Sequence, residues 1–206
     1  MVSFLQYVFE VISISMTGTL SPGPLTTALI SWGSRKGWRA GLYASIGHTI
    51  VEFPLVVGIA MGIYLILEEG ILRILGMIGG ILLLFMGVFQ IVRREKERRE
   101  EGGRALGVGI LLTGLNPYFI IWWFAIGVRI ISTTVILFGF AGILLMYVLH
   151  VWLDYVWMIL VSELSYRGCK LWGKLEVILK YVTGILMILF GLFFIMDALQ
   201  QSFLAP

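Results

Sequence analysis

The stretch that decides the fold is GILLLFMGVFQI, residues 80–91, which carries no charged side chain and a single polar one, Gln90. A second stretch, GILMILFGLFFI at 184–195, is identical to it at six of 12 positions, including both glycines. Continuous apolar runs are typical of helices that cross a bilayer, whereas the strands of a membrane barrel alternate apolar and polar residues. The stretch therefore predicts an all-α membrane protein with an internal repeat.

The composition of the whole chain agrees with this prediction. Of 206 residues, 59% are hydrophobic and 13% are charged, about half the charged share of a soluble domain, and the mean hydropathy is +0.98. The net charge of +3 does not indicate nucleic acid, because the basic residues fall in short segments between apolar runs. One cysteine, Cys169, allows no internal disulfide. The N-terminal residues lack a cationic head, so we expect a first span rather than a signal peptide.

Six apolar segments are long enough to span a membrane, which takes about 20 residues. They are residues 4–33, 38–67, 71–92, 105–128, 133–162 and 175–199. The first, third and fifth loops hold 13 of the 15 lysines and arginines; Arg73 and Arg129 fall in the second and fourth. Basic loops stay in the cytoplasm. We therefore expect a multi-pass protein of a prokaryotic plasma membrane with both termini outside.

The repeat divides this arrangement into two halves of three spans. His48 and His150 are 102 residues apart, as are Glu52 and Asp154, and LSP at 20–22 is echoed by LNP at 115–117. Because three is odd, the second half enters the membrane inverted. We expect a first repeat at 1–94, a charged cytoplasmic linker at 95–104 and a second repeat at 105–206. Inverted repeats with broken helices near the midplane are common in secondary transporters.

Two proline motifs interrupt the apolar segments at corresponding places. LSPGPLTT (20–27) and LNPYFIIWW (115–123) contain prolines that cannot donate a backbone hydrogen bond. In lipid, the carbonyls that lose their donors need other partners or must line a cavity. A helix that restarts after such a break presents N–H groups to an anion. We predict broken helices at Pro22–Pro24 and Pro117 and a substrate contact by Ser21, Pro22, Gly23, Pro24, Asn116 and Pro117; the alternative is a purely structural kink, which we favour for Pro54.

Both histidines of the chain precede an acid by four residues, in GHTIVEF (47–53) and LHVWLDY (149–155). Residues four apart share a helix face, and His48 and Glu52 lie some 15–21 Å into their span at about 1.5 Å per residue. Ionisable groups at this depth normally face a cavity or a partner. We predict that His48, Glu52, His150 and Asp154 form one central site that binds protons or an amino group.

Other interpretations of the two pairs stay open. Each pair could satisfy itself along its own helix, or all four side chains could hold zinc or iron. No third histidine or second cysteine supports a metal, so we expect no cofactor, with the proton as coupling ion. Tryptophans near the pairs could stack on a ligand or gate its passage: Trp122, Trp123, Trp152 and Trp157.

The segment SPGPLTTALISWGSRKGWRAGLYASIGHTIVEF resembles the N-terminal signature of the LysE/RhtB translocator superfamily, the lysine- and threonine-exporter-like proteins. Pro22, Gly23 and Pro24 match its P-G-P turn; Gly37, Gly41 and Gly47 match its spaced glycines; Glu52 matches its acid; Asn116 and Pro117 match its N-P segment. Val51 stands where many members have glycine. Length, six spans and two repeats fit as well, so the resemblance covers essentially the whole chain.

The resemblance implies export of amino acids or other small solutes, driven by the proton-motive force, with some relatives handling metal cations. We therefore expect a secondary transporter, not an enzyme, that exports an amino acid or a related cationic or zwitterionic compound. A metal-cation exporter is the first alternative and a membrane-embedded metal-dependent enzyme the second. The expected partners are the lipid bilayer and a small-molecule substrate, without nucleic acid; the G-x-x-x-G spacings Gly37–Gly41 and Gly76–Gly80 are compatible with a homodimer.

Overall fold

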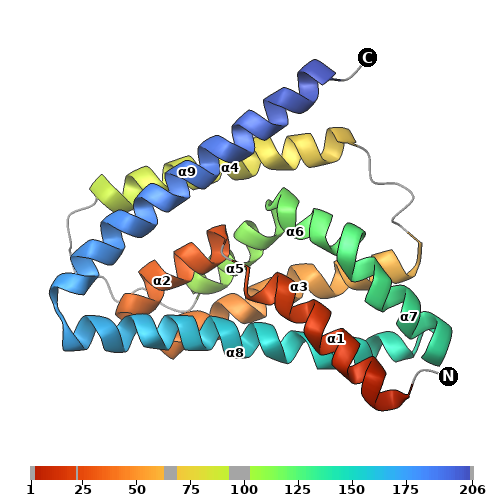
Figure 1. Cartoon of the computed structure of the whole chain (residues 1–206). Helices are drawn as coiled ribbons and strands as arrows, with labels where there is room; N and C mark the ends of the chain where they lie inside the picture. Colours follow the sequence, from red (N-terminus) through yellow and green to blue (C-terminus); the bar gives the residue numbers. More distant parts are fainter. Residues whose placement is uncertain (1–2, 22, 63–68, 93–102, 205–206) are drawn as a thin grey trace.

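The part of the chain that the structure describes is entirely helical. A computed structural model describes residues 3–21, 23–62, 69–92 and 103–204, and these ranges contain no strand (Figure 1). In chain order the elements are α1 (Phe4–Thr19), α2 (Pro24–Lys36), α3 (Trp38–Ala60), α4 (Glu69–Val92), α5 (Gly103–Gly114), α6 (Pro117–Trp122), the π-helical turn η2 (Trp123–Gly127), α7 (Val128–Phe138), α8 (Gly142–Leu171) and α9 (Lys174–Leu204).

The first apolar segment forms two helices rather than one. Helix α1 ends at Thr19 and α2 begins at Pro24, a residue type whose missing N–H is harmless in the first turn of a helix. Pro22 lies outside the described residues. The chain is therefore broken where the sequence predicted, between Thr19 and Pro24.

The second predicted break is also present. Helix α5 ends at Gly114 and α6 begins at Pro117, after Asn116. From Pro117 the helix runs without interruption through η2 and α7 to Phe138, with η2 as a local widening of its turns. The linker predicted at 95–104 lies outside the described residues, except that Gly103 and Arg104 begin α5.

The boundaries predicted for the fourth and fifth spans, 105–128 and 133–162, are wrong. Arg129 lies in a helix, not in a loop, and its side chain donates to Glu10 of α1 at 3.0 Å. The helix continues to Phe138 and ends at Gly139, whose φ of 65° is a conformation that favours glycine. Because Arg129 is paired with Glu10, its charge can lie on a helix and does not mark a loop. The next helix, α8, begins only at Gly142.

Four helical stretches in the described ranges are long and apolar enough to cross a membrane: Trp38–Ala60, Pro117–Phe138, Gly142–Leu171 and Lys174–Gln200. Two further apolar helical stretches are shorter, Gly76–Val92 and Arg104–Gly114. Pro54 stays inside α3 without ending it. The chain is thus a multi-pass helical membrane protein.

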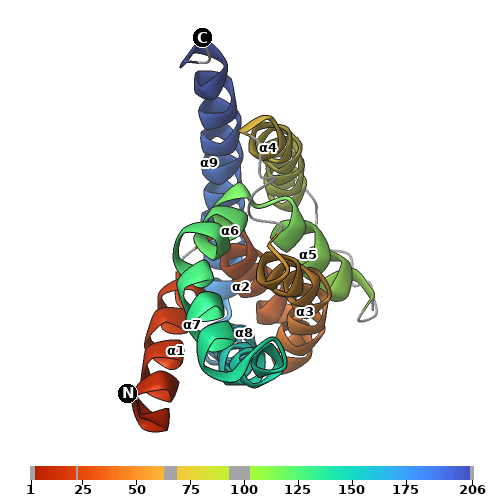
Figure 2. The same cartoon turned by 90° about the vertical axis from the view of Figure 1, so that its right-hand side faces the viewer.

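Helices α4 and α9 pair along their length at one side of the molecule, where α9 also packs on α2 (Figures 1 and 2). Their contacts are reciprocal: a Cβ atom at Gly87 would lie 2.7 Å from the carbonyl oxygen of Gly184, and one at Gly191 would lie 2.7 Å from that of Gly80. Gly80 and Gly184 hold equivalent places in the two apolar stretches, and so do Gly87 and Gly191. The same glycine contact therefore occurs twice at this crossing, once from each helix. Small residues allow the two backbones to approach this closely.

The remaining helices pack around α3 and α8, which contact each other directly (Figure 2). Gly41 of α3 meets the backbone of Met158 in α8, and Gly47 meets that of Leu106 in α5. A buried apolar cluster that includes Val11, Val56, Trp123, Ile130 and Met146 joins α1, α3, η2, α7 and α8. This cluster closes one end of the bundle and leaves the two helix breaks beside the middle of α3 and α8.

Candidate functional site

Four ionisable side chains meet in the interior, from the middle of α3 and of α8. His48, Glu52, His150 and Asp154 are between 1% and 6% exposed. Each histidine lies over its acid one helical turn away, and the close packing of α3 on α8 brings the two pairs together. Buried charges persist only with partners, so the hydrogen bonds of this cluster decide what it can do.

Glu52 is the centre of the cluster. Its Oε1 accepts from His48 Nε2 at 3.1 Å, from His150 Nε2 at 3.1 Å and from Trp123 Nε1 at 3.2 Å. Its Oε2 accepts from the hydroxyl of Tyr147 at 3.1 Å. A carboxylate offers about four acceptor positions, and four donors from three elements converge on Glu52, three on Oε1 and one on Oε2. These hydrogen bonds fix the position of the carboxylate. Each imidazole directs the N–H group at Nε2 toward it.

Asp154 is held less completely. Its Oδ1 accepts from the Thr19 hydroxyl at 2.7 Å. Its Oδ2 lies 3.1 Å from His150 Nε2, but that nitrogen directs its single proton to Glu52, and Oδ2 has no hydrogen-bond donor among the described residues. The Nδ1 of His150 likewise has no partner there. The two acids, although at corresponding positions in sequence, have different surroundings.

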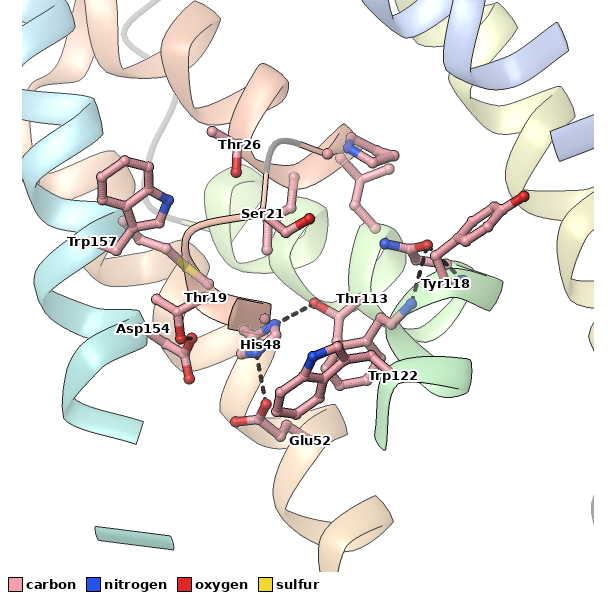
Figure 3. Close-up of a pocket in the computed structure, with 18 of the residues that line it drawn as sticks. Thr19, Ser21, Thr26, His48, Glu52, Thr113, Tyr118, Trp122, Asp154 and Trp157 are labelled. Atoms are coloured by element: carbon pink, nitrogen blue, oxygen red, sulfur yellow. Dashed lines mark hydrogen bonds and ion pairs between the residues drawn. The ribbon is translucent and has the colours of Figure 1, made fainter. Parts of the chain in front are cut away.

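Each helix break sends a hydroxyl group to the cluster (Figure 3). Thr113, the penultimate residue of α5, forms a hydrogen bond of 2.8 Å between its hydroxyl and His48 Nδ1. Thr19, the last residue of α1, donates to Asp154 as described. Thr19 lies in the first half of the chain and its partner Asp154 in the second. Thr113 lies in the second half and its partner His48 in the first. Each of these two hydrogen bonds therefore joins an ionisable residue of the cluster to the end of a helix beside a break.

A cavity of about 320 Å³ adjoins the cluster, within the range of small-molecule sites. Besides the ionisable groups it is lined by the hydroxyl-bearing Thr19, Ser21, Thr26 and Thr113. Aromatic side chains form much of the remaining wall: Tyr118, Phe119, Trp122, Trp123 and Trp157, with Phe190, Phe193 and Phe194 from α9. Figure 3 shows Trp157 and Trp122 on either side of His48 and Asp154.

The two helices that restart at the breaks differ at their N-termini. The side chain of Asn116 caps α6 and accepts from the backbone N–H groups of Tyr118 at 3.1 Å and Phe119 at 3.4 Å. Helix α2 has Gly23 at the equivalent position and no side-chain cap, and its first residues, Pro24, Leu25 and Thr26, line the cavity. Of the two, only the N-terminus of α2 is available to an anionic group in the cavity.

The structure gathers the candidate residues predicted from sequence around one cavity, as far as it describes them. The four ionisable residues, Ser21, Gly23, Pro24 and Asn116 all line it. Pro117 is buried at the start of α6, and Pro22 is outside the described residues. Of the four tryptophans, Trp122, Trp123 and Trp157 line the cavity, whereas Trp152 is 45% exposed and does not. The roles of these residues stay predictions.

The sequence analysis did not predict three hydrogen-bond partners of the cluster: Tyr147, Thr113 and Thr19. Tyr147 lies three residues before His150, on the same face of α8, and this spacing was the available signal. Thr113 directly precedes its break, as Thr19 does, and that parallel was also visible in the sequence. Neither residue type is distinctive in an apolar helix, so only the fold makes their roles evident.

Three side chains have the chemistry and proximity of metal ligands. One donor atom from each of His48, Glu52 and Asp154 lies within 4.8 Å of the others. Imidazole and carboxylate suit several divalent cations. The donors around Glu52 oppose this use, because Oε1 already accepts three hydrogen bonds and His48 directs Nε2–H toward it. A metal would have to displace these protons before it could bind.

Comparison with known proteins gives one family. The sequence model for the LysE type translocator matches residues 16–198, most of the chain. Neither the curated proteins nor the solved structures give a match. The matched range includes both helix breaks and all four ionisable residues of the site.

Proposed function

The chain belongs to the LysE type translocator family, and on that premise we propose that it is a secondary transporter that exports a small cationic or zwitterionic solute, such as an amino acid. The observation that carries the proposal is the buried cluster of two histidines and two acids beside a cavity and two helix breaks. Ionisable groups inside a membrane are costly and mark pathways for ions or substrates.

The proposed architecture is six spans in two inverted repeats, at 1–94 and 105–206. In it, α1 with α2 forms the first span, and α5 with α6, η2 and α7 forms the fourth. The reciprocal glycine contacts of α4 and α9 support the inverted relation, because they are unchanged when the halves are exchanged. The exchange of hydroxyl contacts between halves, Thr19 with Asp154 and Thr113 with His48, supports it too.

Proton coupling is the proposed driving mechanism. Imidazole and carboxylate groups exchange protons near neutral pH. A proton taken up by the cluster changes which of its atoms donate and which accept, and the contacts of Thr19 and Thr113 pass that change to the two breaks. The breaks are where rigid helical pieces can change their relative angle. The cluster would thus link protonation to opening of the cavity on alternate sides.

The orientation proposed from the basic loops places both termini outside a prokaryotic plasma membrane. In Figure 1 the turn between α2 and α3, the end of α4 and the turn between α8 and α9 lie at one end of the molecule, and the N-terminus and the turn between α7 and α8 lie at the other. Thus segments expected on one side of the bilayer are together. The lipid bilayer and the small-molecule substrate are the proposed partners; a homodimer stays open.

Metal-cation export is the second candidate, favoured by one observation, the closeness of His48, Glu52 and Asp154. It differs from solute export in a measurable way. Purified protein would then bind zinc or another divalent cation stoichiometrically, and His48→Ala would abolish that binding. Proton-coupled solute export requires no such binding.

The test uses protein reconstituted in liposomes, loaded with a mixture of labelled amino acids and amines. We expect a solute to move against its gradient when a pH gradient is imposed and to stop when an uncoupler removes it. Asp154→Asn and Glu52→Gln should reduce this movement at least tenfold, while the matched charge change Glu10→Gln, at the exposed Arg129 contact, should leave it unchanged. Transport that persists in both variants without a pH gradient would refute proton coupling through the cluster.

A further inference from the structure

The two acids of the site differ in how many of their oxygen atoms are occupied. Both oxygens of Glu52 accept hydrogen bonds, from four donors in all. Asp154 accepts one, from Thr19 to Oδ1, and its Oδ2 has no donor within the described ranges although the side chain is buried. A buried carboxylate oxygen without a donor is rare in folded proteins. Its position at the cavity wall indicates a ligand that supplies the donor.

The charges of the cavity determine the sign of that ligand. Within the described part of the chain, the lining contains two carboxylates and no lysine or arginine. The carboxylate of Glu52 has the imidazoles of His48 and His150 beside it, whereas Asp154 has that of His150 alone, with Nε2 3.1 Å from Oδ2 and directed toward Glu52. Asp154 is the acid with an acceptor left over. A cationic donor is therefore favoured at Oδ2 and an anion is disfavoured.

The walls near Asp154 determine what the rest of the ligand is like. Trp157 lies one turn along α8 from Asp154, and Trp122 stacks beside His150 with ring centroids 6.2 Å apart. Aromatic faces attract organic cations and bury their carbon atoms. Phe190 and Phe194 of α9 line the cavity too. These surfaces suit an apolar body better than a hydrophilic chain with a second charge.

We propose that Asp154 Oδ2 is an ammonium-binding subsite, and that the ligand of this cavity is a small organic ammonium compound with an apolar body. The N–H groups of the ammonium supply the donor that Oδ2 lacks, and the apolar body packs on the aromatic wall. Glu52 does not touch the ligand; it positions the two histidines. The inference deepens the proposed export function and rests on it for its biological meaning, but the binding itself is tested separately.

The hydrogen bonds also separate this ligand from a divalent metal ion. A metal at His48, Glu52 and Asp154 must first remove protons that these groups use to bind one another. An ammonium group at Oδ2 requires no such change, because the oxygen it binds is the one without a donor. Binding of an ammonium compound should therefore leave the Glu52 contacts intact.

The experiment uses the purified full-length protein in detergent and follows tryptophan fluorescence, since several tryptophans line the cavity. The probe is 2-phenylethylammonium, and 2-phenylethanol serves as a neutral compound of nearly the same shape. We expect the ammonium compound to bind at least tenfold more tightly than the alcohol, as a charge-assisted hydrogen bond implies. Asp154→Asn should remove that preference, while Glu10→Gln, which neutralises an acid distant from the cavity, should keep it.

Asp154→Asn can still accept the Thr19 hydrogen bond, so it is expected to fold. A measurement on the wild-type protein covers the case in which it does not. A hydrophobic carbodiimide modifies buried carboxyl groups, and mass spectrometry locates the product. The probe should protect Asp154 from modification and leave the reactivity of Glu52 unchanged.

Several outcomes would overturn the subsite. They are equal binding of the ammonium compound and the alcohol, equal binding by wild type and Asp154→Asn, absence of wild-type binding up to about 10 mM, or displacement of the probe by stoichiometric zinc. The export proposal fails differently. If the probe binds through Asp154 but no solute moves in liposomes, export is wrong and the subsite stands; if Asp154→Asn transports normally, the subsite is wrong and export stands.

Discussion

The two halves of the chain match at one place and differ at another. Where α4 crosses α9, each half contributes the same glycine contact, Gly80 to Gly191 and Gly184 to Gly87. In the site, the corresponding acids have unequal surroundings: Glu52 accepts four hydrogen bonds and Asp154 accepts one. A shared framework therefore carries two specialised carboxylates. The comparison teaches that function should be sought where equivalent residues stop having equivalent neighbours.

The largest expected difference between the halves is in stability. Glu52→Gln replaces an acceptor of four hydrogen bonds by a group with one oxygen, and its amide protons face the buried donors. Each donor left unsatisfied costs about 1–3 kcal/mol, so we expect a loss of about 3 kcal/mol in the free energy of unfolding. Asp154→Asn should lose less than about 1 kcal/mol, since the Thr19 contact remains. Thermal unfolding in detergent measures both, and equal losses would remove the proposed distinction.

The glycine crossing gives a smaller effect, and one that should be equal in the two halves. A valine at Gly80 would collide with Ile195 and the Gly191 carbonyl, and one at Gly184 with Ile91. Overpacking of this kind costs about 1–3 kcal/mol. We expect Gly80→Val and Gly184→Val to lower the unfolding temperature by similar amounts. Gly107→Val is the control, because no atom lies within 4 Å of a Cβ built there; a large effect in one half alone would contradict the reciprocal arrangement.

The smallest expected effect is the difference in stability between substitutions at the two helix breaks. Asn116→Ala removes the cap of α6 and should cost about 1 kcal/mol. Ser21→Ala, at the position that matches Asn116 in the LSP and LNP motifs, should change the unfolding temperature very little, because Gly23 precedes α2 and no side chain caps that helix. The same thermal unfolding assay measures the pair. A similar loss in both variants would mean that the two breaks are held alike.

The sequence predicted those features that depend on local chemistry. Prolines 24 and 117 begin helices because their rings fit a first turn and cannot continue the turn before. The i, i+4 spacing of each histidine and acid fixed their common helix face. The prediction failed at Arg129, because a single charge looks the same in a loop and on a helix whose neighbour supplies Glu10.

The hydrogen-bond pattern of the site was beyond prediction from one sequence. Trp123 and Tyr147 reach Glu52 only because η2 and α8 pack against α3, and no spacing within the chain records that contact. The inequality of Glu52 and Asp154 has the same origin. The repeat in the sequence predicted two similar acids, and tertiary packing makes them different.

The α4–α9 crossing has a consequence for the origin of the chain. A contact in which each helix offers the other the same glycines can be made by two copies of a single sequence. Under the proposed inverted repeat, a gene for one three-helix half, inserted into the membrane in both directions, would have assembled through this contact before duplication and fusion. The two acids would then have diverged only after fusion, toward the different roles proposed for them.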